Sequence, residues 1–554
     1  MRDRLAVVAA IIALTLLSFF QFPGHTYLGS DTQIYVPMLE RIWDPSVLSR
    51  DLVATKPHLS YTLYDEIAIA LRWITHSSFH AVLVAQQLLF RAFEILGVYL
   101  LALSFPLARR MALCVAAMFT LGATIVGPAV LTLEYEPVPR AFAVGLIFLA
   151  IGLAAQNHLM LADIAAAVAF LYHPPTVAAF WLLYLWLVLR HRDYRDLWPL
   201  ALGVLILLVS SRLQSGAPVA QEFFKRVSPE TEILGRMRTG YNWVTTWAAA
   251  LYWQYIFLWL ASVAAFRRIQ PKAARLFLVG MPLIGILTIP LSYFLLEKLK
   301  WGFIPQFQPA RALLFVSAFA MILGAGAAIR AAETERWWEC VVWFVIVLAV
   351  PSSARLYQIT WRQLIVAVCV AVLLAGVLYA QRFGWGPAVL AAAAIVPFFA
   401  LPSLGLVRNF RPIDLSGVDD LCRYARAQTS KDTMFLFGDA GQSSNPSVFR
   451  AESLRAVYVD WKAGGQLNYQ EAIGQEWWRR WQETNWLRFD PSEIARLPAL
   501  GIDFLILSKE HRLTNSAPAY ENNSFVVYRV GHASGLPGQT GGLSNRTQPI
   551  STND

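Results

Sequence analysis

The chain has 554 residues, of which 57% are hydrophobic and 15% are charged; its mean hydropathy is +0.47 and its formal net charge is +10. Soluble domains contain about 25% charged residues, so this composition excludes an ordinary soluble protein. Apolar runs of about 20 residues recur, each long enough to cross a hydrocarbon core of about 30 Å, which predicts a polytopic α-helical membrane protein. Much of the positive charge falls in short loops, where Lys and Arg set topology, so we infer no nucleic-acid partner.

The first apolar run, residues 5–22, predicts a crossing that leaves the N-terminus in the cytoplasm, because Arg2 and Arg4 precede it. Residues 23–79 are then a long exterior loop, and long ordered loops are often functional. Within this loop, residues 61–74 have helical periodicity and are expected to lie along the membrane surface.

Further apolar runs predict about 13 crossings within residues 1–407, which puts the C-terminus outside. The run 159–190 is divided by Pro174 and Pro175, which block a continuous helix, so we expect two short helices with His173 at the exterior turn. The other predicted crossings are 80–105, 111–130, 141–156, 197–211, 244–265, 276–296, 312–329, 340–352, 363–380 and 386–405. The exterior loops that follow from them, besides 23–79, are 131–140, 212–243 and 297–311.

The composition changes near residue 408, and residues 408–530 read as a soluble α/β domain on the exterior side. Alternating apolar segments predict strands, and amphipathic segments predict helices. The predicted strands are 433–438, 456–461, 503–508 and 525–530, and the predicted helices are 417–428 and 469–483. The tail 531–554 is rich in Gly, Ser, Asn and Thr and is expected to be disordered.

Carboxylates in the first two exterior loops are the candidate catalytic groups. Asp31 lies just past the first crossing among aromatic and apolar residues, where a carboxylate can act as a base or bind a cation. Glu134 and Glu136 lie in the stiff loop LEYEPVPR, and Asp31 with Glu134 could share Mg²⁺ or Mn²⁺. The alternatives are a solvated loop residue for Asp31, and ion pairs to Arg140 or to loop arginines for the glutamates.

Cationic and polar residues at the exterior ends of helices are the candidate substrate-binding groups. Arg140 and Arg311 open two helices there, and guanidinium groups match phosphate oxygens; snorkelling to headgroups is the alternative. Gln308 and His173 lie at the same level, His173 being either a ligand contact or a structural residue beside proline.

Two residues of the first exterior loop, Asp44 and His58, complete the substrate-binding candidates, although Asp44 beside Pro45 could instead cap a short helix.

Arg91 and Glu94 share one face in the middle of a predicted crossing. Charges at that depth either form an internal ion pair or face a wet cavity.

These features together resemble the GT-C superfamily of membrane glycosyltransferases. The resemblance rests on the N-terminus inside, the large first exterior loop with Asp31 just after helix one, the acidic second loop, and the exterior α/β domain after about 13 helices. It implies that Asp31 is the catalytic acidic residue of the first loop, and that Glu134 or Glu136 is the second-loop residue that some members use with a metal. The family's usual acidic pair is broken here, since Thr32 and Gln33 follow Asp31.

The resemblance implies an inverting glycosyltransferase that uses a polyprenyl-phosphate-linked sugar, with an acceptor that is a lipid, a glycan or a protein. HPP (173–175) and QPAR (308–311) resemble segments of uncharacterised bacterial proteins of this type, which implies the inner membrane of a bacterium with the C-terminal domain periplasmic or extracellular. Two other hypotheses stay open: a transporter or flippase whose route is lined by Arg91 and Glu94, and a non-catalytic scaffold that presents the C-terminal domain.

Overall fold

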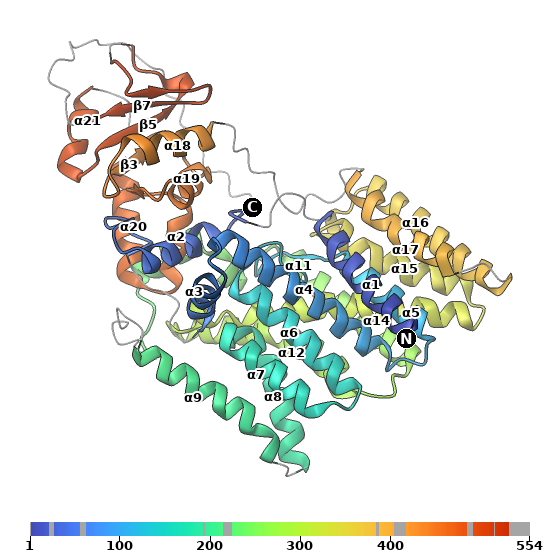
Figure 1. The fold of residues 1–554 in the computed structure, drawn as a ribbon. Helices are drawn as coiled ribbons and strands as arrows, with labels where there is room; N and C mark the ends of the chain where they lie inside the picture. The colour runs from blue at the N-terminus through green and yellow to red at the C-terminus, as the bar shows by residue number, and fades with distance from the viewer. Residues whose placement is uncertain are drawn as a thin grey trace.

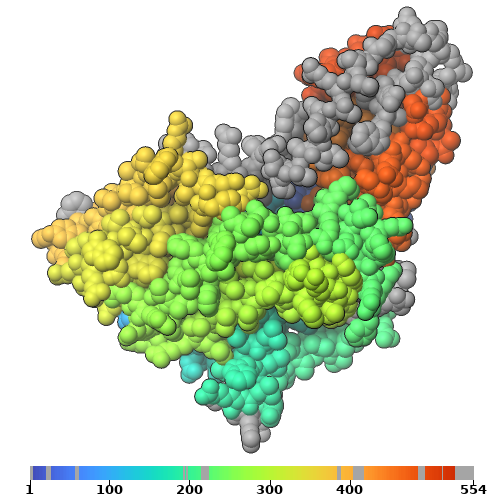
Figure 2. Space-filling model, turned by 180° about the vertical axis from the view of Figure 1, so that it is seen from behind, coloured from blue at the N-terminus to red at the C-terminus, as the bar shows by residue number. Residues whose placement is uncertain are grey.

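The computed structural model describes residues 2–20, 27–55, 62–191, 194–213, 224–383, 387–403, 417–484, 491–514 and 516–530. A large bundle of helices forms the first part of the chain, and a smaller α/β unit stands out from one end of it (Figure 1). The space-filling view from behind shows the same arrangement, with the C-terminal unit beside the green segment that follows α9 (Figure 2). The prediction of an apolar helical bundle followed by a C-terminal α/β unit is confirmed.

The bundle contains both long and short apolar helices. Five of the described helices are long and apolar enough to cross a membrane: Phe79–Ala102, Ala249–Ile269, Arg275–Lys298, Ile304–Glu333 and Trp361–Phe383. The number of crossings stays a prediction. The bundle helices are α1 (Arg2–Leu17), α4 (Phe79–Ala102), α5 (Arg109–Thr120), α6 (Pro139–Ala155), α7 (Leu159–Tyr172), α8 (Pro174–His191), α9 (Trp198–Leu213), α11 (Ala249–Ile269), α12 (Arg275–Ser292), α14 (Leu313–Glu333), α15 (Trp337–Ser352), α16 (Trp361–Ala380) and α17 (Pro387–Ser403).

Helix α14 occupies the centre of the bundle. Nearly all of its residues are buried, because it packs on α11, α12, α15 and α5. Its sequence is apolar on every side, which is typical of a helix surrounded by other helices. Most other bundle helices keep an exposed apolar side, as α9 does with Leu205, Leu208 and Leu213.

Glycines bring α4 and α6 into close contact. A Cβ atom added at Gly97 would overlap the backbone carbonyl of Phe148, and one at Gly152 would overlap that of Gly97. A Cβ at Gly145 would overlap the carbonyl of Phe90 in the same way. Small residues allow membrane helices to approach this closely, and α6 carries Arg140 at its N-terminal end.

The predicted crossing at 111–130 is wrong in its second half. Helix α5 ends at Thr120, and a hairpin of β1 (Thr124–Ile125) and β2 (Val130–Leu131) follows. Gly122 and Gly127 have φ of 67° and 94°, a left-handed conformation that glycine adopts without steric cost, so the chain turns instead of continuing as a helix. The two-helix prediction for 159–190 is confirmed by α7 and α8, with His173 between them.

Short elements gather at the end of the bundle that faces the C-terminal unit. They include α3, which confirms the helix expected within 61–74, and α2, which the sequence analysis did not predict. Their bounds are α2 (Thr32–Trp43), α3 (Tyr64–Thr75), α10 (Pro229–Arg238), η3 (Gly240–Asn242), α13 (Ile304–Phe307) and η6 (Pro309–Ala312).

The C-terminal unit is built on a five-stranded sheet with strand order β4-β3-β5-β7-β6. Strands β4, β3 and β5 are parallel, and β7 and β6 are antiparallel to their neighbours. All four predicted strands and both predicted helices are present. The elements are α18 (Val418–Gln428), β3 (Met434–Phe437), α19 (Asn445–Ser453), β4 (Ala456–Val457), η9 (Lys462–Asn468), α20 (Glu471–Thr484), α21 (Pro491–Ala495), β5 (Phe504–Ser508), β6 (Tyr520–Glu521) and β7 (Phe525–Arg529).

A buried ion-pair network joins this unit to the segment that follows α2. Arg450 of α19 is 1% exposed and pairs with Asp460, and its Nη1 atom lies 3.8 Å from Oδ2 of Asp51. The Asp51 carboxylate also accepts a hydrogen bond of 3.1 Å from the backbone N–H of Val457. Buried charges are tolerated only when they are paired in this way, so the network holds the two parts of the chain in a defined arrangement.

The predicted boundary at 407–408 and the tail 531–554 lie outside the described residues.

The contact between α4 and α6 provides a test of the bundle. In Gly97→Ala, the new methyl group has to displace the α6 backbone, so we expect a loss of stability of about 1–3 kcal/mol, measured as a lower unfolding temperature of the purified protein in detergent. Gly376→Ala in α16 is the matched control, because a Cβ there meets no atom within 4 Å. It should leave stability unchanged or raise it by up to about 1 kcal/mol. Equal unfolding temperatures for the two variants would contradict the packing.

Candidate functional site

A cavity of about 290 Å³ lies where the helical bundle meets the C-terminal unit. Its wall combines charged and aromatic side chains from segments that are far apart in the sequence. The lining residues are Ser30, Asp31, Ile34, Tyr35, Thr124, Ala129, Val130, Leu131, Tyr135, Glu136, Val138, Arg140, His173, Arg238, Tyr241, Arg311, Lys462, Gly465, Gln466 and Tyr469. The structure therefore brings together Asp31, Glu136, Arg140, His173 and Arg311 from the sequence-based set, while their functional roles stay predictions.

Asp31 stands at the start of α2 and is held between two cations. Lys462 Nζ donates to its Oδ1 atom at 2.7 Å, and Arg140 Nη2 lies 3.5 Å from its Oδ2 atom. The carboxylate keeps 31% of its side-chain area exposed to the cavity. It is thus accessible to a ligand while its charge is balanced by neighbours.

Glu136 fixes the turn that carries Asp31. Its carboxylate accepts hydrogen bonds of 2.6 Å from the backbone N–H groups of Ser30 and Asp31, and one from the hydroxyl of Thr32. Thr32 in turn accepts from the N–H of Leu28, a residue with φ of 56°. The loop 131–140 therefore determines where the Asp31 carboxylate points.

Glu134 has a different role, because its side chain turns away from the cavity and anchors Arg140. Its Oε1 atom lies 2.6 Å from Nε of Arg140, and its side chain is 1% exposed. The backbone carbonyl of Glu134 accepts hydrogen bonds from Arg91 and from Gln87 of α4. The guanidinium of Arg140 is thus held in a fixed position between Glu134 and Asp31.

The two carboxylates that face the cavity have opposite electrostatic surroundings. Burial alone would raise the pKa of Asp31, but the charges of Lys462 and Arg140 outweigh it and hold that pKa well below its usual value. Burial, together with the negative charge of Asp31, raises the pKa of Glu136. Asp31 is therefore ionised at neutral pH.

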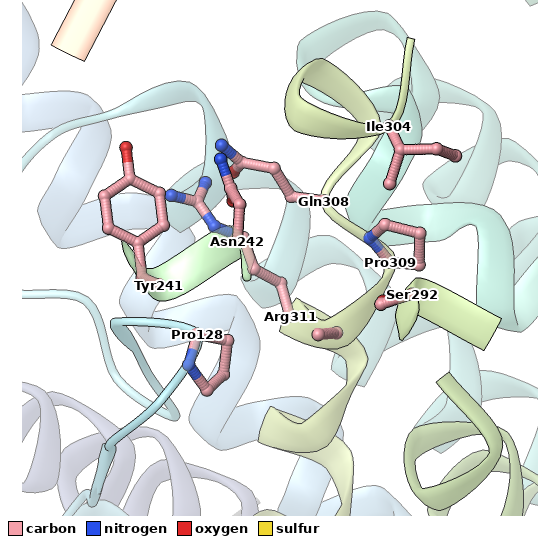
Figure 3. Close-up of a pocket in the computed structure, with 9 residues that line it drawn as sticks. Pro128, Tyr241, Asn242, Ser292, Ile304, Gln308, Pro309 and Arg311 are labelled. Atoms are coloured by element: carbon pink, nitrogen blue, oxygen red, sulfur yellow. The ribbon is translucent and has the colours of Figure 1, made fainter. Parts of the chain in front are cut away.

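Arg311 lies at the junction between this cavity and a smaller one of about 10 Å³ (Figure 3). Figure 3 shows its side chain among those of Tyr241, Asn242 and Gln308. Its Cζ atom lies 5.8 Å from the ring centroid of Tyr241, and its Nε atom has no hydrogen-bond partner within the described part of the chain. Arg311 therefore lines both cavities, and its Nε donor is not used by the described residues.

His173 lines the cavity, and its hydrogen bond to Thr176 indicates which ring nitrogen carries the proton. Its Nδ1 atom accepts from the backbone N–H of Thr176 at 3.2 Å, so Nε2 carries the proton of the neutral ring. Burial and the positive charges of Arg311 and Arg140 hold the pKa of His173 well below its usual value. His173 is thus a neutral hydrogen-bond donor at this site.

The sequence analysis missed the cavity residues that the C-terminal unit and α10 supply. Lys462, Gln466 and Tyr469 come from η9 and its end, and Arg238 ends α10. Arg238 donates to the backbone carbonyls of Trp461 and Lys462, at 2.9 and 3.3 Å, and so connects the two segments. No local motif marks these residues, because only long-range packing brings them to the cavity.

Other candidates lie away from the cavity. The prediction that Asp44 binds substrate is corrected, because Asp44 lies at the surface. It accepts a hydrogen bond from the backbone N–H of Ser46 and pairs with Lys431 at 2.9 Å. Gln308 lines only the smaller cavity. His58 lies outside the described residues.

Arg91 and Glu94 are not among the described residues that line the larger or the smaller cavity. Arg91 donates to Ser18 at 3.0 Å and to the Glu134 carbonyl, which gives it a structural contact at the base of the site.

The expected Mg²⁺ or Mn²⁺ site does not fit the arrangement of Asp31 and Glu134. Both carboxylates already engage the guanidinium of Arg140, which lies between them, and Asp31 also pairs with Lys462. No group of three or more His, Cys, Asp or Glu side chains converges among the residues that the structure describes. We therefore derive no step through a metal ion.

The arrangement can bind an anion and accept a proton. Guanidinium and ammonium groups form short, charge-assisted hydrogen bonds with phosphate oxygens, and Arg140, Arg311, Arg238 and Lys462 all reach the cavity wall. Asp31 is the exposed carboxylate among these cations. The site therefore suits a phosphate-bearing molecule beside an ionised carboxylate.

Comparison with known proteins yields one family match and several similar structures. Residues 417–484 match a domain of unknown function, DUF6798, and no curated protein matches the chain. This matched region includes α19, η9 and α20, and thus Lys462.

Three solved structures are similar to nearly the whole chain. ArnT from Cupriavidus metallidurans in the apo state is 16% identical with a TM-score of 0.47, covering 97% of this chain and 100% of that chain. The arabinofuranosyltransferase AftD from Mycobacteria is 15% identical with a TM-score of 0.43, covering 96% of this chain and 40% of that chain. ArnT has also been solved bound to undecaprenyl phosphate, at 15% identity and a TM-score of 0.46 over 96% of this chain and 99% of that one. These likenesses concern the fold and assign no activity.

The contact between Glu134 and Arg140 generates a prediction about the stability of the site. Glu134→Gln keeps the side-chain shape but leaves the buried guanidinium with only the more distant Asp31, so we expect a loss of about 3 kcal/mol, measured by thermal unfolding in detergent. Glu476→Gln is the control, because Glu476 pairs with Arg479 and Arg480 at the surface. Its loss should be about 0–1 kcal/mol, and a Glu134→Gln protein as stable as this control would contradict the anchoring role.

Proposed function

We propose that this protein is a membrane glycosyltransferase of the GT-C type, which transfers a sugar from a polyprenyl-phosphate-linked donor to an acceptor on the exterior side of the membrane. The observation that carries the proposal is the placement of Asp31 beside Arg140, Arg311 and Lys462 in one cavity at the end of an apolar helical bundle. A lipid-linked phosphate matches both features, because its headgroup needs cations and its chain needs an apolar environment.

In the proposed reaction, the Asp31 carboxylate accepts the proton of the acceptor hydroxyl or amine as that group attacks the anomeric carbon. The new bond forms between the acceptor atom and the anomeric carbon, and the bond from that carbon to the phosphate oxygen breaks. The electron pair of the broken bond stays with the polyprenyl phosphate, whose additional negative charge Arg140 and Arg311 stabilise. A single displacement of this kind inverts the anomeric configuration.

The neutral imidazole of His173 supports the same reaction. Its Nε2–H group can donate a hydrogen bond to a phosphate oxygen without competing for the acceptor's proton. The aromatic rings of Tyr35, Tyr241 and Tyr469 also line the cavity and offer flat surfaces for a sugar ring.

The transporter hypothesis predicts a different result from the same preparation. Proteoliposomes in which the substrate crosses the bilayer without cleavage of the sugar–phosphate bond would favour it. The contacts of Arg91 with Ser18 and the Glu134 carbonyl offer no support for a polar route through α4.

Replacement of the proposed base tests the function directly. Asp31→Asn keeps the side-chain size but removes the proton acceptor, so we expect transfer to fall about 10²- to 10⁴-fold. The measurement is glycan and lipid-linked sugar profiling of a deletion strain complemented with wild type or the variant at equal expression. Asp420→Asn, on the exposed side of α18, is the control and should complement fully. Transfer near the wild-type level by Asp31→Asn would reject the assignment.

Replacement of an arginine tests the phosphate-binding part of the proposal. Arg311→Met removes charge-assisted hydrogen bonds to a phosphate, so we expect undecaprenyl phosphate to bind about 10- to 100-fold more weakly to the purified protein. Arg479→Met is the matched control, because Arg479 is half exposed on α20 and pairs with Glu476 and Glu483. If both variants bind this lipid as tightly as wild type does, Arg311 does not hold the phosphate.

A further inference from the structure

Lys462 reaches the candidate base from the opposite end of the chain. Its Nζ atom donates to Oδ1 of Asp31 and to Oγ of Ser30, both at 2.7 Å. Its side chain is 22% exposed and forms part of the cavity wall. The C-terminal unit therefore supplies a charged group to the site as well as covering it.

The backbone around Lys462 is held more firmly than its side chain. Arg238 binds the carbonyls of Trp461 and Lys462, and the Asp460 carboxylate accepts from the N–H of Ala463 while it pairs with the buried Arg450. The ammonium group, in contrast, donates to Ser30 and Asp31, which line the cavity. A lysine side chain has four flexible carbons, so the ammonium can change partners while the backbone stays in place.

The contact with Lys462 makes Asp31 a weak base. A general base works best when its pKa lies near the working pH. Burial raises the pKa of Asp31, but the charges of Lys462 and Arg140 lower it more, so the pKa of Asp31 lies below its usual value. An efficient base at this position needs at least one cation to be drawn away from it. A bound phosphate is the group in the proposed reaction that attracts cations.

Asp31 is surrounded by titratable or charged groups from every element that packs around it. These groups are Lys462 and Tyr469 of the C-terminal unit, Arg140 of α6, Tyr135 and Glu136 of the preceding loop, Arg311 of η6, Arg238 of α10 and Tyr35 of α2. Among them, Lys462 combines a short contact to Asp31 with a flexible side chain, while Arg140 is anchored by Glu134.

We propose that Lys462 senses the donor: in the observed arrangement its ammonium group pairs with Asp31, and when a lipid-linked phosphate enters the cavity it moves to the phosphate and releases the Asp31 carboxylate. This inference rests on the proposed function and adds a coupling between donor binding and activation of the base. The enzyme then holds an active base only while a donor is present. The C-terminal unit is required for this coupling because it carries the lysine.

The proposal makes Asp31 and the lipid phosphate competitors for one ammonium group. Asp31→Asn should therefore bind undecaprenyl phosphate more tightly than wild type, by about threefold to tenfold, although its sugar transfer is strongly reduced. Lys462→Met should bind this lipid about tenfold more weakly. In the double variant, the gain from Asp31→Asn should disappear, because the shared cation is gone.

The affinity of purified full-length protein for undecaprenyl phosphate, measured for wild type, both single variants and the double variant, tests the proposal. Lys431→Met is the matched control, since Lys431 pairs with Asp44 at the surface of the same unit, and it should bind like wild type. Lys462→Arg keeps the charge and should retain most of the affinity. A purely structural lysine would instead lower the unfolding temperature and leave the two substitutions additive.

The outcomes separate this proposal from the proposed function. Wild-type protein that does not bind undecaprenyl phosphate would overturn the proposed function and the inference with it. Wild-type binding together with an Asp31→Asn affinity that is unchanged or lower would overturn the inference alone. This second result needs no substitution of Lys462, so it decides the question even where Lys462→Met does not fold.

Discussion

A row of alternating charges, Glu134–Arg140–Asp31–Lys462, determines the geometry of the cavity. Each inner member lies between two groups of opposite sign, which makes the cost of burying these charges tolerable. The four residues come from the second loop, from α6, from the turn before α2 and from η9. The cavity therefore forms only when the bundle and the C-terminal unit are assembled against each other, and removal of one charge leaves its neighbour without a partner.

The acidic second loop, LEYEPVPR, shows which contacts of a short motif can be predicted from the sequence and which cannot. From LEYEPVPR it could be predicted that two carboxylates lie near Arg140 and the first loop. The loop directs Glu134 to Arg140 and Glu136 to the backbone N–H groups of Ser30 and Asp31. From the sequence, the two glutamates could be catalytic or metal-binding groups or could form ion pairs with Arg140. In the structure Glu134 pairs with Arg140, and Glu136 positions the backbone that carries Asp31. Which carboxylate meets which donor depends on backbone geometry that no spacing rule contains.

Hydropathy predicted most of the bundle, because apolar runs of helical length have few other ways to be buried. It failed at residues 111–130, where an apolar composition also fits a hairpin and the left-handed turns at Gly122 and Gly127 decide the outcome. The strands of the C-terminal unit were likewise predictable from alternation. Lys462 and Arg238 were not, because their importance arises from contacts between segments more than 200 residues apart, as in the bond from Arg238 to Trp461. Asp31 was found because it follows the first predicted crossing, and His173 and Arg311 because each lies at the end of a predicted helix.

The buried Arg450 network explains why the contact between Asp31 and Lys462 can be short and still changeable. Arg450 binds Asp51, which follows α2, and Asp460, which precedes η9. These two aspartates flank the segments that carry Asp31 and Lys462, so the backbones on both sides of the ion pair are fixed by the same guanidinium. Motion that alters the pair must then occur in the flexible lysine side chain and not in the docking of the C-terminal unit. A site built in this way can change the partner of one charge without opening the interface between its two parts.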